Sequence, residues 1–283
     1  MTSTPTLRRL RLGLPTLLGL AKRGYFIPYR YAGQVPADSH AGGYPFIAEM
    51  FERLEADFLS LLSDTATIRD IARRFDGAAP PAPRWQQSWF PRLDGLAAYL
   101  MTRRHQPARI MEIGSGHSTR FLAVAIADGG FDSEIWAIDP KPRADIAGLG
   151  PVTVHRRTLQ EVPPDQFRSL KPGDFLMIDS SHIAVPGSDV DLLLGRIVPL
   201  LPAGTFLQIH DMFLPDAYPE TWEWRGYNEQ LPVAALLAGG GFRPVWSSHW
   251  IASRCAAVLS DGPVGDIPLM DGAFETALWL EKL

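Results

Sequence analysis

Residues Arg109–Ile126 read RIMEIGSGHSTRFLAVAI, and this stretch decides the fold. A short apolar run leads to Glu112, a turn with Gly114 and Gly116 follows, and the next residues have the apolar spacing of a helix. Glycines let the backbone approach a ligand closely, and the start of a helix offers free N–H groups. The stretch therefore predicts a strand, loop and helix that hold a nucleotide-type cofactor.

Short apolar runs alternate with helical segments along the rest of the chain. Ser188 is placed to cap the helix between the fourth and fifth runs. Short buried strands that alternate with helices favour an α/β fold with a mostly parallel, doubly wound, Rossmann-like sheet. The expected strands are Arg109–Gly114, Glu134–Asp139, Val152–Arg156, Asp174–Asp179, Thr205–His210, Phe242–Ser248 and Thr276–Lys282.

The first 80 residues have a different character. Apolar residues at helical spacing between Ile47 and Phe75 predict helices, and the stretch DGAAPPAPRW at residues 76–85 then concentrates prolines. We therefore expect an N-terminal helical region, or cap, over residues 1–80 that helps to form the substrate pocket. A Rossmann-like domain is expected over residues 81–283, and it should begin with a helix near Leu93–Met101.

The N-terminal stretch TLRRLRLGLPTLLGLAKRGYFIPYRYA, residues 6–32, combines basic residues with an apolar run. The run is too short to span a bilayer, and no small-residue cleavage site follows it. We expect a helix that packs on the body of the protein. The alternatives are a basic, apolar segment that rests on a membrane surface, and a targeting peptide. An apolar N-terminus is also consistent with a homodimer.

Composition excludes several classes of protein. The chain of 283 residues is 46% hydrophobic and 20% charged, which is ordinary for a soluble globular protein. Its formal net charge of −4 gives no electrostatic footprint for nucleic acid. The single cysteine, Cys255, excludes an internal disulfide and a cysteine-rich zinc site. A reducing, cytoplasmic location fits best.

Two details distinguish between the possible cofactors. The dinucleotide fingerprint requires glycine at the sixth position of G-x-G-x-x-G, where this chain has Thr119. Glu112 would repel a pyrophosphate but attract a cationic amino-acid group, unless it pairs with Arg120. Asp139 stands at the end of the second strand, where a carboxylate can accept hydrogen bonds from both ribose hydroxyls, unless it caps the next segment. An S-adenosyl cofactor is therefore favoured.

The order Glu-x-Gly-x-Gly resembles the first motif of class I S-adenosylmethionine-dependent methyltransferases. The motifs EIGSGHST, AIDP, MIDSSH, LQIHDMFLPDAYPETW and YNEQ, in this order, are similar to the methyltransferase 24 subgroup from about Phe90 to the C-terminus. Ser118 stands where many members have a third glycine. The resemblance implies a seven-stranded sheet with the last strand antiparallel, and an adenine near Thr158–Gln160. The residues it implies for the cofactor are Glu112, Gly114, Ser115, Gly116, Ser118, Asp139 and Asp179.

Four polar residues follow two strands that should be neighbours: Asp179, His182, His210 and Asp211. In one interpretation His182 or His210 is a general base, with its tautomer fixed by an aspartate such as Asp211. In another, Asp179, His210 and Asp211 bind a divalent metal that lowers the pKa of a substrate hydroxyl, as in methyltransferases of catechol-like substrates, which this site resembles. His210 stands where such enzymes usually have an acid, which makes a softer metal than magnesium possible. A purely structural role is the third interpretation.

The aromatic loop PDAYPETWEWRGYNEQ follows the fifth strand, and it is either a lid over the acceptor or part of the core. We expect methylation of a small molecule at oxygen, on a sugar or secondary metabolite. A nicotinamide-dependent oxidoreductase is an alternative, against which Thr119 and Glu112 count. The third hypothesis is a non-catalytic binding protein with a cofactor fold.

Overall fold

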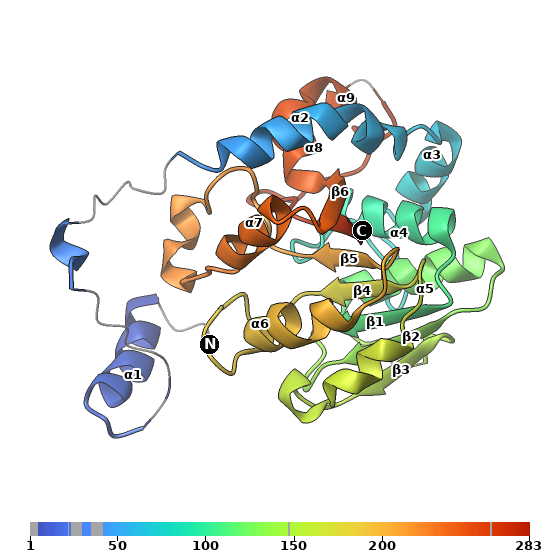
Figure 1. Cartoon of the computed structure of the whole chain (residues 1–283). Coiled ribbons are helices and arrows are strands. Elements are labelled where there is room, and N and C mark those ends of the chain that lie inside the picture. The colour runs from blue at the N-terminus through green and yellow to red at the C-terminus, as the bar shows by residue number, and fades with distance from the viewer. Residues whose placement is uncertain (1–4, 22, 24–29, 35–41, 147, 261) are drawn as a thin grey trace.

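The computed structural model describes residues 5–21, 23, 30–34, 42–146, 148–260 and 262–283. A twisted sheet occupies the centre of the molecule, with α4 (Arg92–His105) and α5 (His117–Gly129) on one side and α6 (Asp189–Leu192) and α7 (Gln230–Ala238) on the other (Figure 1). This three-layer arrangement is the doubly wound, Rossmann-like fold that the alternating pattern predicts.

The sheet in the described part of the chain has seven strands in the order β3-β2-β1-β4-β5-β7-β6. Strand β7 runs antiparallel to both β5 and β6, and the pairs among β1 to β5 are parallel. Each strand expected from the sequence is present, as is the antiparallel last strand. The bounds are β1 Arg109–Ile113, β2 Glu134–Ile138, β3 Val152–His155, β4 Phe175–Ile178, β5 Phe206–Ile209, β6 Phe242–Ser247 and β7 Leu278–Lys282.

The expected helices are also present, and one apolar span is divided into two helices. The apolar span that begins at Ile47 forms two helices, because Asp64 accepts a hydrogen bond from the Thr67 N–H at 3.0 Å and so begins a new helix. Ser188 caps α6 as predicted, since its hydroxyl accepts from the Asp191 N–H. The remaining helices are α1 Pro5–Leu17, α2 Pro45–Ser60, α3 Thr65–Arg74, α8 Ser248–Arg254 and α9 Ala256–Ser260.

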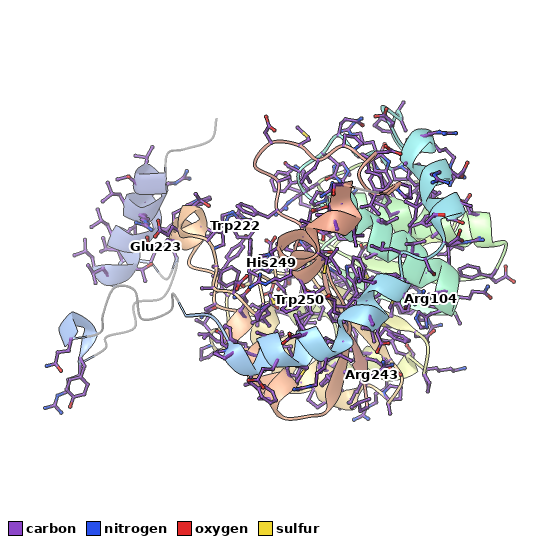
Figure 2. All side chains as sticks on the ribbon, turned by 90° about the horizontal axis from the view of Figure 1, so that it is seen from above. Arg104, Trp222, Glu223, Arg243, His249 and Trp250 are labelled. Carbon is purple, nitrogen blue, oxygen red and sulfur yellow. The ribbon has the colours of Figure 1, made fainter. Side chains whose placement is uncertain are left out.

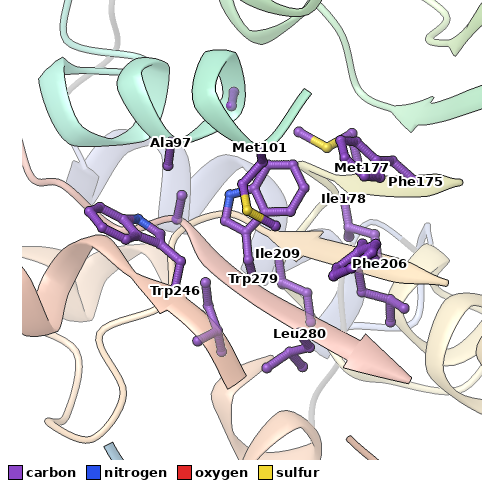
Figure 3. Packing of buried hydrophobic residues seen from close by; sticks show 14 of the residues in the cluster. Ala97, Met101, Phe175, Met177, Ile178, Phe206, Ile209, Trp246, Trp279 and Leu280 are labelled. Atoms are coloured by element: carbon purple, nitrogen blue, oxygen red, sulfur yellow. The ribbon is translucent and has the colours of Figure 1, made fainter. Parts of the chain in front are cut away.

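A continuous hydrophobic core joins the sheet to the helices on its faces. Met101 of α4 and Phe175 of β4 meet Trp279 of β7 in this core (Figure 3). Phe51 and Phe58 of α2 are fully buried in the same cluster. Burial of each such side chain stabilises the fold by roughly 1.5–3 kcal/mol. The core thus runs across the predicted boundary at residue 80 without a break, and a separate N-terminal unit stays a prediction.

The N-terminal helix α1 forms as expected, but it does not pack on the body of the protein. Its leucines at positions 7, 10, 14 and 17 are between 49% and 59% exposed, and α1 lies apart from the sheet (Figure 1). Much of the quoted stretch after α1, including residues 24–29, lies outside the described residues. Among the helices that are described, none has the length and apolar character needed to cross a membrane.

Candidate functional site

Gly114 begins the loop after β1 in a backbone conformation that excludes other residues. Its φ angle is +76°, and a Cβ atom there would lie 2.1 Å from the carbonyl oxygen of Asp179. The Gly114 N–H donates to the carbonyl oxygen of Ile138 at 3.1 Å. The loop is therefore held tightly between the ends of β2 and β4.

Glu112 lies beneath this loop and is 1% exposed. Its carboxylate accepts hydrogen bonds from Ser118 Oγ at 2.5 Å and from Thr119 Oγ1 at 2.6 Å. Burial raises the pKa of Glu112 to about 7, although these hydrogen bonds oppose the shift. Arg120 does not pair with it, because its guanidinium donates to the carbonyl oxygen of Asp145. Glu112 therefore fastens the loop to α5, and its contact with a cofactor stays a prediction.

A cavity of about 280 Å³ opens beside the loop, and we call it the loop cavity. The residues predicted to contact adenine, Thr158 and Gln160, line it. Of the residues predicted to hold the rest of the cofactor, four line the loop cavity and three of the described residues do not. The four are Gly114, Ser115, Asp139 and Asp179, and the three are Glu112, Gly116 and Ser118.

Asp139 fixes the shape of the loop cavity. Its Oδ2 accepts from the Ser115 N–H at 2.8 Å and from Ser115 Oγ at 3.0 Å, and its Oδ1 accepts from the Lys141 N–H at 2.7 Å. Each carboxylate oxygen has two lone pairs, so Oδ1, which accepts one hydrogen bond, keeps capacity for a ligand hydroxyl, whereas Oδ2 already accepts two. The bond to Lys141 shows that Asp139 also caps the segment after β2.

A second cavity, of about 190 Å³, adjoins the first, and we call it the histidine cavity. The four polar residues predicted at the strand ends all line it: Asp179, His182, His210 and Asp211. Asp179 and Arg143 line both cavities. Parallel strands β4 and β5 are neighbours, which brings their carboxyl ends and the residues after them together.

His182 lies between carboxylates on both of its ring nitrogens. Its Nδ1 is 2.8 Å from Glu229 Oε2, and its Nε2 is 3.2 Å from Asp179 Oδ1 and 3.4 Å from Asp211 Oδ2. His182 and Asp211 have left-handed backbones, with φ of 61° and 56°. Such strain costs about 1–3 kcal/mol per residue and is concentrated at functional sites.

His210 has a similar environment on the other side of the two aspartates. Its Nε2 is 3.1 Å from Asp94 Oδ2, and its Nδ1 is 3.4 Å from Asp211 Oδ1 and 3.8 Å from Asp179 Oδ1. Asp94 comes from the first turn of α4 and is fully buried. The Asp94 carboxylate also accepts hydrogen bonds from the backbone N–H groups of Thr276 and Ala277, which directly precede β7. Its position is therefore fixed independently of the histidine.

The carboxylates hold both histidines in their charged form. Burial alone would lower the pKa of His182, but hydrogen bonds to Asp179 and Glu229 outweigh it and raise the pKa well above its ordinary value. The pKa of His210 is also well above its ordinary value, because the charge of Asp211 and the hydrogen bonds to Asp179 and Asp94 exceed the effect of burial. The two imidazolium groups in turn hold the pKa of Asp179 well below its usual range, against burial.

The fit of a metal to these side chains is limited. Among the described residues, no group of three or more His, Cys, Asp and Glu side chains is arranged to hold one. Each ring nitrogen of His210 already faces a carboxylate, although the mixture of imidazole and carboxylate donors would suit a divalent metal.

The aromatic loop divides between cavity wall, core and surface. Trp222 and Tyr227 line the histidine cavity, Tyr218 packs on Phe213, and Trp224 is 40% exposed. Trp222 lies on the opposite side of the molecule from Arg104 (Figure 2). Some residues of the loop therefore lie where a lid over the acceptor would, and others pack as core residues do.

Two site residues were not predicted as such. Glu229 stands at the N-cap of α7 and also holds His182. Its place in the quoted motif YNEQ was a signal. Asp94 lies within the predicted helix before β1, where nothing in the local sequence sets it apart from other polar residues.

The comparisons with known proteins agree with this geometry. Residues 111–212 match the methyltransferase-domain family model Methyltransf_24. The comparison with curated proteins gave no match.

Several solved structures are similar at low identity. The SAH-bound Podospora anserina methyltransferase PaMTH1 has 16% identity and a TM-score of 0.42, over 92% of this chain and 99% of that one. The plantazolicin methyltransferase BpumL in complex with SAH has 15% identity and a TM-score of 0.41, over 84% and 99%. The apo-structure of CmcI-N160 has 14% identity and a TM-score of 0.42, over 67% and 70%.

The matched segment, residues 111–212, begins in β1 and includes the loop and the ends of β4 and β5. In the described part of the chain, the sheet around it has the seven strands and the antiparallel last strand that the resemblance implies. The chain therefore contains a segment, residues 111–212, that matches a methyltransferase domain, and this segment lies within a Rossmann-like sheet.

Proposed function

We propose that the loop cavity holds S-adenosylmethionine and that the histidine cavity holds the methyl acceptor. The observation that carries this proposal is the wall shared by the two cavities, formed by Asp179 and Arg143. Methyl transfer requires the donor and acceptor atoms to meet in line, and adjoining cavities allow such a meeting. Asp139 would accept the ribose hydroxyls, Thr158 and Gln160 would contact adenine, and Glu112 would act through the loop.

The acceptor is proposed to react at a hydroxyl oxygen, with a histidine as general base. S-adenosylmethionine, when bound, supplies the methyl group and leaves as S-adenosylhomocysteine. In its neutral form, His182 or His210 would accept the proton of the acceptor hydroxyl at the ring nitrogen that deprotonation frees, as the hydroxyl oxygen forms the new bond to carbon. Each histidine has one nitrogen on a buried carboxylate, Glu229 or Asp94, which orients the other nitrogen toward Asp179 and Asp211.

A divalent metal held by Asp179, His210 and Asp211 is the second candidate. His210 Nδ1 lies 3.4 Å from Asp211 Oδ1 and 3.8 Å from Asp179 Oδ1. Such a metal would lower the pKa of the acceptor hydroxyl. The buried Asp94 fixes the orientation of the His210 ring through Nε2, which supports the base instead.

The acceptor is proposed to be a small molecule with a flat or sugar-like ring. Trp89, Trp222, Tyr227 and Phe274 line the histidine cavity, and aromatic walls stack on such rings. The test is transfer of labelled methyl from S-adenosylmethionine to a panel of hydroxylated sugars and phenols, with and without chelator. Turnover that survives chelation supports the base. If the protein binds S-adenosylhomocysteine but methylates no member of either class, the proposed acceptor class is wrong.

We propose that the N-terminal segment contacts a membrane surface, that the protein forms a homodimer, and that it is cytoplasmic. The leucines exposed on α1 lie beside the basic residues Arg9 and Arg11, which suits contact with an anionic membrane surface. Sedimentation with anionic and neutral vesicles tests this contact, and sedimentation velocity without vesicles tests the homodimer. The buried, unpaired Cys255 is consistent with a reducing, cytoplasmic location.

A further inference from the structure

The histidine cavity contains two guanidinium groups that proton transfer does not require. Arg143 stacks on Trp89 with its guanidinium carbon 4.5 Å from the ring centre. Arg225 stacks on Trp222 at 3.7 Å. Both arginines line the cavity with those tryptophans. Stacking fixes the plane of a guanidinium and leaves its edges available for hydrogen bonds.

Arg225 has hydrogen-bonding capacity that the described residues do not satisfy. Its Nη1 is 3.4 Å from the Tyr227 hydroxyl and 3.9 Å from Asp211 Oδ2, so the contact with the aspartate is longer than a hydrogen bond. Its Nε is buried and has no hydrogen-bond partner among those residues. A charged donor left without a partner costs stability, which suggests that a ligand supplies the missing acceptor.

We propose that the methyl acceptor carries an anionic group, a carboxylate or a phosphate ester, that binds the guanidinium of Arg225. This inference rests on the proposed function, because it assigns a substrate class to the histidine cavity. A planar guanidinium binds such groups through two parallel hydrogen bonds, and a free edge on Arg225 would be used in this way. Since Nη1 is 3.9 Å from Asp211, the anionic group would lie close to the reacting hydroxyl, with the guanidinium between it and the aspartate.

The experiment measures ligand binding to the protein loaded with S-adenosylhomocysteine, through the fluorescence of the cavity tryptophans. The probes are 3,4-dihydroxybenzoate, its neutral analogue 3,4-dihydroxybenzyl alcohol, and phenyl phosphate. We expect at least one anionic probe to bind about tenfold or more tightly than the alcohol, as a charge-assisted bidentate pair predicts. The tighter of the two anions distinguishes a carboxylate from a phosphate acceptor.

Variants assign the preference to one side chain. Arg225→Gln should remove the preference, and Arg225→Lys should retain only part of it, because lysine keeps the charge but not the planar pair of donors. Arg243→Gln is the matched control: Arg243 pairs with Glu281 on an exposed part of β6, far from Trp222 (Figure 2). Arg143 is left unchanged because it borders the loop cavity as well.

The proposal is overturned if the alcohol binds as tightly as both anions, if none of the probes binds, or if Arg225→Gln keeps the preference. Affinity for S-adenosylhomocysteine, measured on every variant, should stay within about twofold of the parent, because Arg225 does not line the loop cavity. If the parent protein itself does not bind S-adenosylhomocysteine, the proposed function is contradicted, and not only the anionic acceptor.

Discussion

The loop cavity and the histidine cavity share a wall but are constructed differently. The backbone of the turn after β1 shapes one wall of the loop cavity, where Gly114 permits a conformation closed to other residues. The charged centre of the histidine cavity comes from the residues that follow β4 and β5, and its two histidines are held by Asp94 of α4 and Glu229 at the start of α7. The first site should therefore be sensitive to backbone geometry, and the second to the removal of single charges.

The largest effect should come from removing the base. His210→Asn and His182→Gln each delete an imidazole, and the variant that loses the base should lose about 10²–10⁴-fold in turnover. Affinity for S-adenosylhomocysteine should change little, since neither histidine lines the loop cavity. Steady-state kinetics and calorimetry measure the two quantities separately. Full turnover in both variants would remove the histidines from the mechanism.

A change in the loop backbone should have the opposite pattern. Gly114→Ala places a Cβ 2.1 Å from a carbonyl oxygen at a φ of +76°, so the loop must shift. We expect cofactor affinity to fall by about tenfold or more, because backbone strain of this kind typically costs about 1–3 kcal/mol. Gly226→Ala is the control, because Gly226 also has a positive φ, +68°, but open space at its Cβ position. Equal losses in both variants would show that φ alone, and not the close approach to Asp179, matters.

The two anchoring carboxylates should identify which histidine is the base. Asp94 contacts only His210 of this pair, and Glu229 contacts only His182. Both contacts raise the pKa of the histidine concerned, so the activity of the parent enzyme should rise with pH above the ordinary histidine range. Asp94→Asn should shift this rise to lower pH if His210 is the base, and Glu229→Gln should do so if His182 is.

Both substitutions keep the shape of the side chain and one accepting oxygen, while an NH2 group replaces the other oxygen, which limits damage to the fold. A pH profile that is unchanged in both variants would contradict base catalysis by either histidine.

The smallest expected effect is on stability. A histidine whose pKa is higher in the folded protein than in the unfolded chain stabilises the fold. The stabilisation is complete at pH values below the unfolded-state pKa, and it is lost as the pH rises through the folded-state pKa. The pKa values of His182 and His210 are both raised, so the free energy of unfolding should decline on the alkaline side of neutrality. Denaturant titrations at several pH values measure it. A stability that increases over that range would mean that the histidines are neutral in the folded protein.

The difference between the cavities also explains how much the sequence could predict. The strands and the residues that follow β4 and β5 are set by local sequence patterns, so the positions of Asp179 and His210 were predicted. Asp94 reaches His210 from α4, a helix that precedes all seven strands of the described chain, and only the tertiary fold brings them together. The exposed leucines of α1 show the same limit, because an amphipathic pattern does not specify what it packs against.

The measurement that tests the central claim most directly is calorimetric titration with S-adenosylhomocysteine. The protein is first stripped with chelator and then supplied with single divalent metals, and reduced nicotinamide dinucleotide is titrated as the comparison ligand. The account predicts one site per chain with a dissociation constant in the micromolar range, with or without metal, and no binding of the dinucleotide. Binding of the dinucleotide alone, or of neither ligand in any condition, would contradict it.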